Sequence, residues 1–125
     1  HTRIIKYFAG LLATTPICSS FFTLFSMANI GLPGTSSFIG EFLIIAGCFF
    51  TNTLAASFSA LGMILGGGYS LWLLNRIIFG NIKNFSIKEF QDLTRIEFFY
   101  LLPYAVLTIL LGIYPEIVIC YIVFI

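Results

Sequence analysis

One acidic side chain lies where a charge is costly. Glu41 is the only Asp, Glu, Lys or Arg between Tyr7 and Asn75, and apolar residues dominate on both sides of it. A bare charge inside a bilayer costs from ~2.5 to above 10 kcal/mol, so intramembrane carboxylates usually face a bundle interior and mark ion or proton pathways. Glu41 therefore indicates proton or ion transfer. The alternative is a structural glutamate that only accepts hydrogen bonds.

A helix-breaking run precedes this carboxylate. Gly31-Leu32-Pro33-Gly34 combines a proline, which removes a backbone donor, with glycines, which tolerate unusual backbone angles. The hydroxyls of Thr35-Ser36-Ser37 are then expected to cap a helix that restarts. Non-helical backbone survives at membrane depth only where protein or water satisfies its polar groups. We therefore expect a break with a functional interior, the alternative being a proline kink without function.

The composition indicates the elements that position these residues. Hydrophobic residues make up 59% of the 125 and charged residues 9%, whereas a soluble domain carries about a quarter charged residues. Uncharged stretches at 7–40, 42–75 and 98–115 can each hold the roughly 20 residues that a span needs. We predict an all-α polytopic membrane protein with about three transmembrane helices, the first discontinuous at Gly31 to Gly34. An ordinary water-soluble enzyme is excluded.

The predicted spans set the topology. The first covers 16–51, the second 54–78 and the third 98–113, while 117–125 is too short to cross alone. If each crosses once, the N-terminus and the 76–97 loop share one side, which then holds all six Lys and Arg. The positive-inside rule assigns that side to the cytoplasm or the mitochondrial matrix. Asp92 and Glu97 either belong to an ordinary solvated loop or line the mouth of a polar path.

Other features favour structural roles. Gly62 and Gly66 lie one turn apart, which we interpret as helix packing. Cys18, Cys48 and Cys120 are far apart in apolar stretches, so neither a metal pair nor a disulfide framework is indicated. A net charge of +1 gives no basic face for nucleic acid. Without an iron–sulfur ligand set or a dinucleotide fingerprint, we expect no cofactor and no metal in this chain.

The run around Glu41 resembles a known family. Residues 31–42, GLPGTSSFIGEF, are similar to the broken-helix signature of the antiporter-like membrane subunits of respiratory complex I. The resemblance covers essentially all of the chain, as about the last quarter of a full subunit. It is also carried by shorter elements, namely His1-Thr2-Arg3, Tyr69-Ser70-Leu71-Trp72 with Arg76 and Phe79-Gly80, and Leu111-Gly112-Ile113-Tyr114-Pro115.

The resemblance implies a fold, a function and partners. The family has two inverted helix repeats, each with a discontinuous helix, and moves protons as the enzyme passes electrons from NADH to ubiquinone. Glu41 would be the terminal acid of the C-terminal half-channel, where the sister subunits, chains 2 and 5, carry lysine. Residues 1–125 would form the C-terminal membrane segment of such a subunit in the mitochondrial inner membrane. Its partners would be lipid, the remainder of its own subunit and chains 2 and 5; His1 receives no proton role.

The chain also departs from the family pattern. The first repeat and the central row of lysine and histidine residues are absent, so the segment alone cannot form a continuous proton path. Either the gene is split or the sequence is a truncated piece of a longer subunit. Three other hypotheses stay open: a subunit of a multisubunit cation/proton antiporter, a small multidrug-type proton-coupled exporter, and a purely structural membrane piece.

Overall fold

The chain folds as a series of helices. The computed structural model describes residues 4–80 and 90–125. The elements are η1 (Ile5–Tyr7), α1 (Leu11–Thr14), α2 (Pro16–Ile30), α3 (Ser36–Thr51), α4 (Thr53–Ile78), α5 (Arg95–Ile113) and α6 (Glu116–Val123). The predicted all-α class is confirmed. The motif His1-Thr2-Arg3 and the part of the loop at 81–89 lie outside the described residues.

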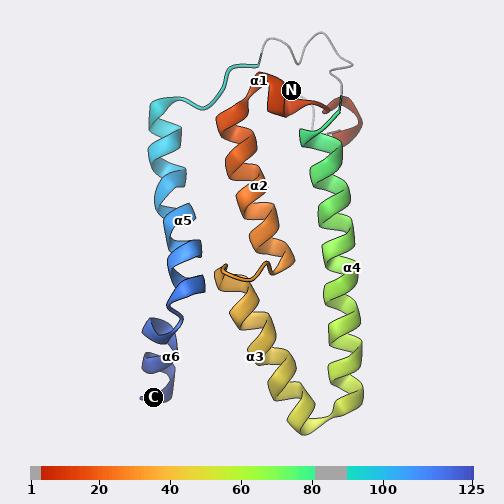
Figure 1. Cartoon of the computed structure of the whole chain (residues 1–125), viewed down its shortest axis with the longest axis vertical. Helices are drawn as coiled ribbons and strands as arrows, with labels where there is room; N and C mark the ends of the chain where they lie inside the picture. The colour runs from red at the N-terminus through yellow and green to blue at the C-terminus, as the bar shows by residue number, and fades with distance from the viewer. Residues whose placement is uncertain (1–3, 81–89) are drawn as a thin grey trace.

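Two short helices share the first crossing. α2 has 15 residues and α3 has 16, and at about 1.5 Å per residue neither reaches through a hydrocarbon core about 30 Å thick. Figure 1 shows them following one another from one end of the molecule to the other, with the interruption near mid-height of α4. The discontinuous helix predicted at Gly31 to Gly34 is therefore confirmed.

The other two spans are continuous. α4 and α5 are each long and apolar enough to cross a membrane. α4 follows α3 after Asn52 alone, whose side-chain oxygen accepts hydrogen bonds from Leu54 N (3.0 Å) and Ala55 N (3.4 Å). α5 begins three residues before the predicted start, because Thr94 and Glu97 form a capping box there.

The helices run in the predicted directions, so the predicted segments lie at each end of the molecule. In Figure 1, α2 and α3 descend, α4 returns to the upper end, and α5 descends again toward α6. The N-terminal residues, the end of α4 and the start of α5 lie at one end, and the turn at Asn52 and the C-terminus lie at the other. Arg76 in the last turn of α4 and Arg95 at the start of α5 are therefore on the same side.

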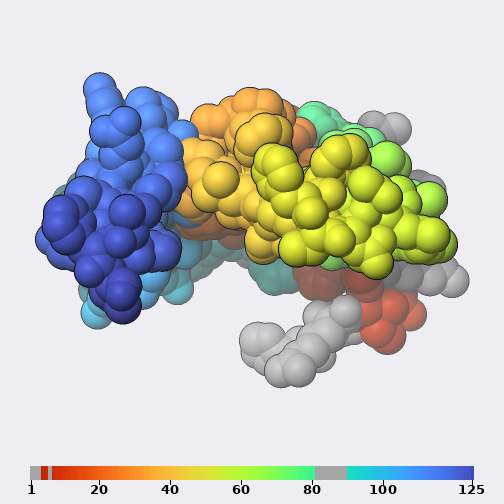
Figure 2. Space-filling view, turned by 90° about the horizontal axis from the view of Figure 1, so that it is seen from below, coloured from red at the N-terminus to blue at the C-terminus, as the bar shows by residue number. Residues whose placement is uncertain are grey.

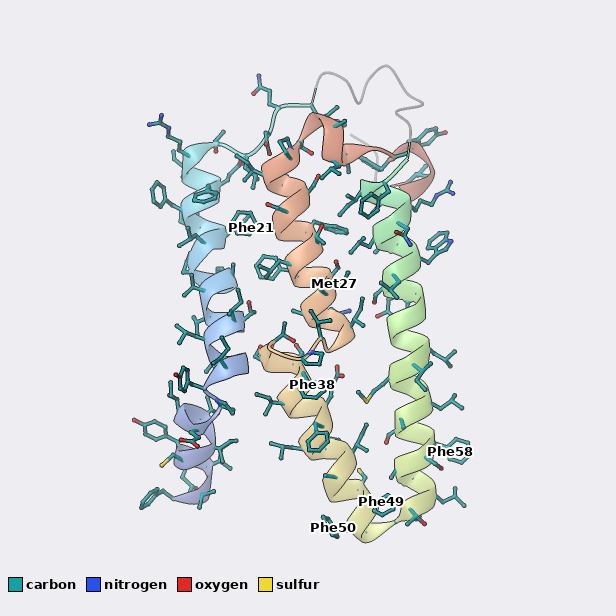
Figure 3. The ribbon with its side chains drawn as sticks, in the orientation of Figure 1. Phe21, Met27, Phe38, Phe49, Phe50 and Phe58 are labelled. Carbon is teal, nitrogen blue, oxygen red and sulfur yellow. The ribbon has the colours of Figure 1, made fainter. Side chains whose placement is uncertain are left out.

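The helices form a layer one helix thick. α2 and α3 lie between α4 on one side and α5 on the other (Figure 1), and the view along the helices in Figure 2 shows the same row. Phe21 of α2 points toward α5 in Figure 3, where its ring meets Phe98 edge to face at 5.5 Å. Within the described residues only five apolar side chains are buried: Ala28, Ala56, Leu74, Ile78 and Ala105. Both faces of the layer thus remain for lipid or other protein to cover.

Candidate functional site: the interrupted helix and Glu41

The first half of the interruption closes α2. Gly31 has φ 85° and ψ 41°, a left-handed conformation that glycine adopts without steric cost. Its N–H donates to Ala28 O (3.1 Å), and Leu32 N donates to Met27 O (3.2 Å). These two bonds form a Schellman motif, which satisfies carbonyl groups that the helix end would otherwise leave without donors. The break is therefore an ordered helix terminus.

The second half of the interruption is a tight turn. Pro33 and Gly34 occupy its two central positions, and Gly34 has φ 96°, as a type II turn requires at the second of them. Leu32 O accepts from Thr35 N (3.1 Å) and from the Thr35 hydroxyl (2.6 Å). The prediction that this hydroxyl caps the next helix is wrong. Thr35 is the N-cap residue of α3, but its side chain points back to the turn and accepts no bond from α3.

Glu41 lies on α3 with its carboxylate folded back to the break. A Cβ placed on Gly31 would be 2.5 Å from Glu41 Oε2 and 3.3 Å from Glu41 Cδ. Oε2 is buried and has no hydrogen-bond partner among the residues that the structure describes. Since buried polar atoms are almost always hydrogen-bonded, we expect a partner for this oxygen outside the described residues. The structure thus brings together three of the predicted site elements: Gly31, the turn at Pro33 and Gly34, and Glu41.

The flank of the break toward α4 carries a polar contact. Asn29 Nδ2 donates to Ser70 Oγ at 3.5 Å, and Ser70 Oγ donates to Gly66 O at 2.9 Å. Nearby, a Cβ on Gly67 would meet Ile30 Cγ2 at 3.5 Å, an ordinary van der Waals separation. α4 therefore packs against the last turn of α2 and supports the break from one side.

Gly62 and Gly66 make no close contact with another helix within the described residues, so their predicted packing role stays a prediction. A Cβ on Gly62 would meet nothing within 4 Å, and one on Gly66 would meet only Tyr69 of the same helix, at 3.8 Å. Gly67, one position further, faces α2 instead. Within the described residues, the face of α4 that contacts α2 is therefore the one that carries Gly67.

A hollow lies beside the break. It measures about 600 Å³ and is lined by Leu32, Pro33, Gly34, Thr35 and Ile109 together with four residues of α2, namely Ser20, Thr23, Leu24 and Met27. The lining contains hydroxyl groups but no ionisable side chain. The hollow therefore offers apolar packing space rather than an ion site.

The carboxylates of Asp92 and Glu97 each accept backbone hydrogen bonds at the start of a helix. Asp92 Oδ2 accepts from Ile17 N and Asp92 Oδ1 accepts from Cys18 N, both at 3.0 Å, so Asp92 caps α2 from the segment before α5. Glu97 Oε2 accepts from Thr94 N at 3.0 Å. Both residues line a hollow of about 290 Å³ at this end of the molecule. Each carboxylate already has backbone donors, which favours structural roles over the mouth of a polar path.

The electrostatics of Asp92 follow from this capping. Partial removal from water raises the pKa of the Asp92 carboxyl, but hydrogen bonds from the backbone N–H groups of Ile17, Leu93 and Cys18 outweigh that effect. The pKa therefore lies below its ordinary value of 3.8. Positive partial charge at the start of α2 favours the ionised carboxylate in the same way. Sequence reasoning missed this cap, because Asp92 is 75 positions away from Ile17.

The residues that could bind a metal or react as thiols stay apart. The described ranges contain no group of three His, Cys, Asp or Glu side chains close enough to hold a metal ion. Cys18 and Cys120 are exposed and Cys48 is partly exposed, each with a free thiol. None of the three is buried, because the layer has little interior among the described residues.

Comparison with known proteins identifies the family. Residues 1–67 match the sequence model of a family described as NADH:quinone oxidoreductase/Mrp antiporter, transmembrane. The chain belongs to this family. The resemblance that GLPGTSSFIGEF carries is thereby confirmed, and the chain is a membrane protein of the antiporter-like class. The multidrug-type exporter hypothesis loses its support, because it assumes a different family.

Antiporter-family relatives match nearly all of the chain. It is 56% identical over 116 residues to NADH-ubiquinone oxidoreductase chain 4 of Marchantia polymorpha, and 50% identical over 115 residues to that of Chondrus crispus. It is also 44% identical over 118 residues to NADH-quinone oxidoreductase subunit M of Rhodobacter capsulatus. The matches cover 93%, 92% and 94% of this chain, respectively, but 23% of each relative. The chain thus spans about a quarter of the length of these curated relatives.

Proposed function

We propose that this chain is the C-terminal membrane segment of a chain 4-type subunit of the proton-translocating NADH:ubiquinone oxidoreductase, with Glu41 as a proton-relay group. The observation that carries the proposal is the buried Glu41 Oε2, which lies against the Gly31 backbone without a partner among the described residues. A carboxyl group held at a break in mid-membrane can accept a proton from one neighbour and release it to another.

The break supports this role in two ways. The N–H groups of Gly31, Leu32 and Thr35 and the Thr35 hydroxyl already donate to backbone oxygens at the break. These donors are therefore not bonded to the Glu41 carboxylate. The absence of a side chain at Gly31 leaves the space that the carboxylate occupies. Glu41 is thereby available to a group supplied from elsewhere in the enzyme.

The missing group is assigned to the rest of the subunit. Relatives named chain 4 or subunit M extend far beyond the matched region, and residues 1–125 would act with that remainder. The neighbouring membrane-arm chains 2 and 5, together with lipid, would cover the open faces of the layer. Two of the three relatives reported above are named NADH-ubiquinone oxidoreductase chain 4. We therefore propose the mitochondrial inner membrane as the location of this segment. We also propose that the segment holds no redox cofactor of its own.

The test is Glu41→Gln in the assembled enzyme. We expect NADH oxidation by uncoupled membranes to continue while the number of protons moved per NADH falls, measured by quenching of an acridine dye in sealed vesicles. Glu116→Gln is the matched control, because Glu116 is an exposed carboxylate at the start of α6. An assembled Glu41→Gln enzyme with the wild-type proton ratio would contradict the proposal.

A second experiment distinguishes the oxidoreductase from the antiporter, the two kinds of complex that the family description names. The family description covers both the oxidoreductase and a cation/proton antiporter. Mildly solubilised membranes are run on a native gel, stained for NADH oxidation, and analysed for peptides of this chain. We expect the peptides in the large stained band. Peptides found only in an unstained complex would support the antiporter instead.

A further inference from the structure

α5 reaches the break at one position. Gly112 is the second-last residue of α5, and a Cβ placed on it would collide with the carbonyl group of Gly34, approaching its carbon to 2.5 Å, and with the carbonyl carbon of Thr35 at 2.7 Å. These are main-chain atoms of the turn. They cannot swing aside as the end of a long side chain can, so the break and α5 are in direct backbone contact.

Other helical glycines make no comparable contact. A Cβ on Gly40, Gly47, Gly62 or Gly68 would meet nothing within 4 Å of the described residues. Gly67, on the α4 side of the break, would meet only a methyl group at 3.5 Å. The close approach is therefore specific to Gly112 and to the α5 side of the break.

The contacted residues connect directly to the carboxylate. Gly34 and Thr35 join the end of α2 to the start of α3, and the Thr35 hydroxyl ties this turn to Leu32 O at 2.6 Å. Glu41 lies in the second turn of α3 with its carboxylate at Gly31. A displacement of Gly34 relative to Gly31 would change the distance between the two ends of the break, and with it the position of the carboxylate.

We propose that Gly112 is a positioning residue for the proton relay, whose lack of a side chain lets α5 fix the position of the break that the Glu41 carboxylate contacts. This inference rests on the proposed role of Glu41. Gly112 itself exchanges no proton; it determines where the turn at Gly34 and Thr35 lies, and thereby where the carboxylate meets its partner.

The test places Gly112→Ala in the intact enzyme. We expect assembly and uncoupled NADH oxidation to be retained, while protons moved per NADH fall at least two-fold. Gly62→Ala makes the same chemical change where the described residues leave space, and should keep the wild-type ratio. An assembled Gly112→Ala enzyme with the wild-type ratio overturns the inference.

A double variant separates positioning from a general packing defect. If Gly112 acts through Glu41, then Gly112→Ala should cause no additional fall in the proton ratio of a Glu41→Gln enzyme. An additive fall overturns the inference. If Glu41→Gln alone leaves the ratio unchanged, the proposed function fails; if it lowers the ratio while Gly112→Ala does not, only the positioning role fails.

A milder variant covers the case in which Gly112→Ala does not assemble. Ile109 lies one turn earlier on α5 and lines the same hollow as Pro33, Gly34 and Thr35. Ile109→Ala enlarges this hollow and reduces the packing of α5 beside the turn without a collision, so it should assemble and also lower the proton ratio. A wild-type ratio for Ile109→Ala, when Gly112→Ala is lost, overturns the inference.

Discussion

The Glu41 carboxylate occupies the space where a side chain at Gly31 would begin. The separation between Oε2 and the ideal Cβ position is 2.5 Å, and the two residues belong to different halves of the interrupted helix. Two independent features of position 31 therefore require glycine: its left-handed backbone, and the Glu41 carboxylate in the space that a side chain would need. Local sequence rules give the first of these, and only the folded arrangement reveals the second.

Gly31→Ala should affect function more than assembly. The left-handed conformation costs about 1–3 kcal/mol for a residue with a side chain, and the new methyl group displaces the flexible end of Glu41. We expect a lower thermal inactivation temperature of the enzyme and a lower proton ratio. Gly40→Ala is the control, because Gly40 is helical and a Cβ there has open space. Equal effects of the two variants would contradict this account.

Asp92→Asn should weaken the start of α2 in a pH-dependent way. The lowered pKa means that the folded chain gives up this proton more readily than the unfolded chain, so the stabilisation is complete above 3.8. It is lost as the pH falls through the lowered value. The thermal midpoint of the variant should lie below that of the wild type at pH 7, and the difference should shrink below pH 3.8. Glu116→Gln is the control, because it removes a carboxylate elsewhere in the chain. If the difference in thermal midpoint between Asp92→Asn and the wild type grows as the pH falls, the cap is contradicted.

Asn52→Ala should destabilise the turn between α3 and α4. Asn52 is the whole connection, and its side chain accepts from two N–H groups at the start of α4. Replacing an N-cap asparagine by alanine costs about 0.5–2 kcal/mol. Thermal unfolding in detergent should show this loss for Asn52→Ala and little loss for Asn52→Asp. If both variants unfold alike, the cap contributes nothing measurable.

Thr35→Val tests the hydrogen bond within the turn. The variant keeps the branched shape but loses the hydroxyl that donates to Leu32 O at 2.6 Å. Because Leu32 O still accepts from Thr35 N, we expect a loss of about 1 kcal/mol rather than collapse of the break. Thr35→Ser should retain most of the stability, measured by thermal unfolding. A Thr35→Ser variant as unstable as Thr35→Val would assign the effect to packing instead.

Local features of the break were predictable from the sequence. Proline and glycine restrict the backbone at their own positions, so Gly31, Pro33 and Gly34 mark the end of α2 without any knowledge of the rest of the fold. The position of Glu41 shortly after the break follows from helix spacing alone. The all-α class and the three crossings follow from the uncharged stretches, because span length is fixed by the bilayer.

Contacts between distant segments were not predictable. The cap on α2 comes from Asp92, and the close approach to Gly34 comes from Gly112, and neither pairing leaves a periodic signal in one sequence. The orientation of the Thr35 hydroxyl depends on the turn geometry, which composition does not specify. The start of α5 was predicted three residues too late, although the spacing of Thr94 and Glu97 is a capping-box signal within the sequence.

A layer one helix thick has a consequence for how stability is set. A partner that binds only the folded state raises the free energy of unfolding, and the increase grows with the concentration of that partner. Glu41 Oε2 has no hydrogen-bond partner among the described residues, and both faces of the layer are open, so the partners proposed above would bind the folded segment. The unfolding free energy of this segment is therefore a function of how much of its neighbours is present. Copies made in excess over them should be the first to be cleared by membrane proteases.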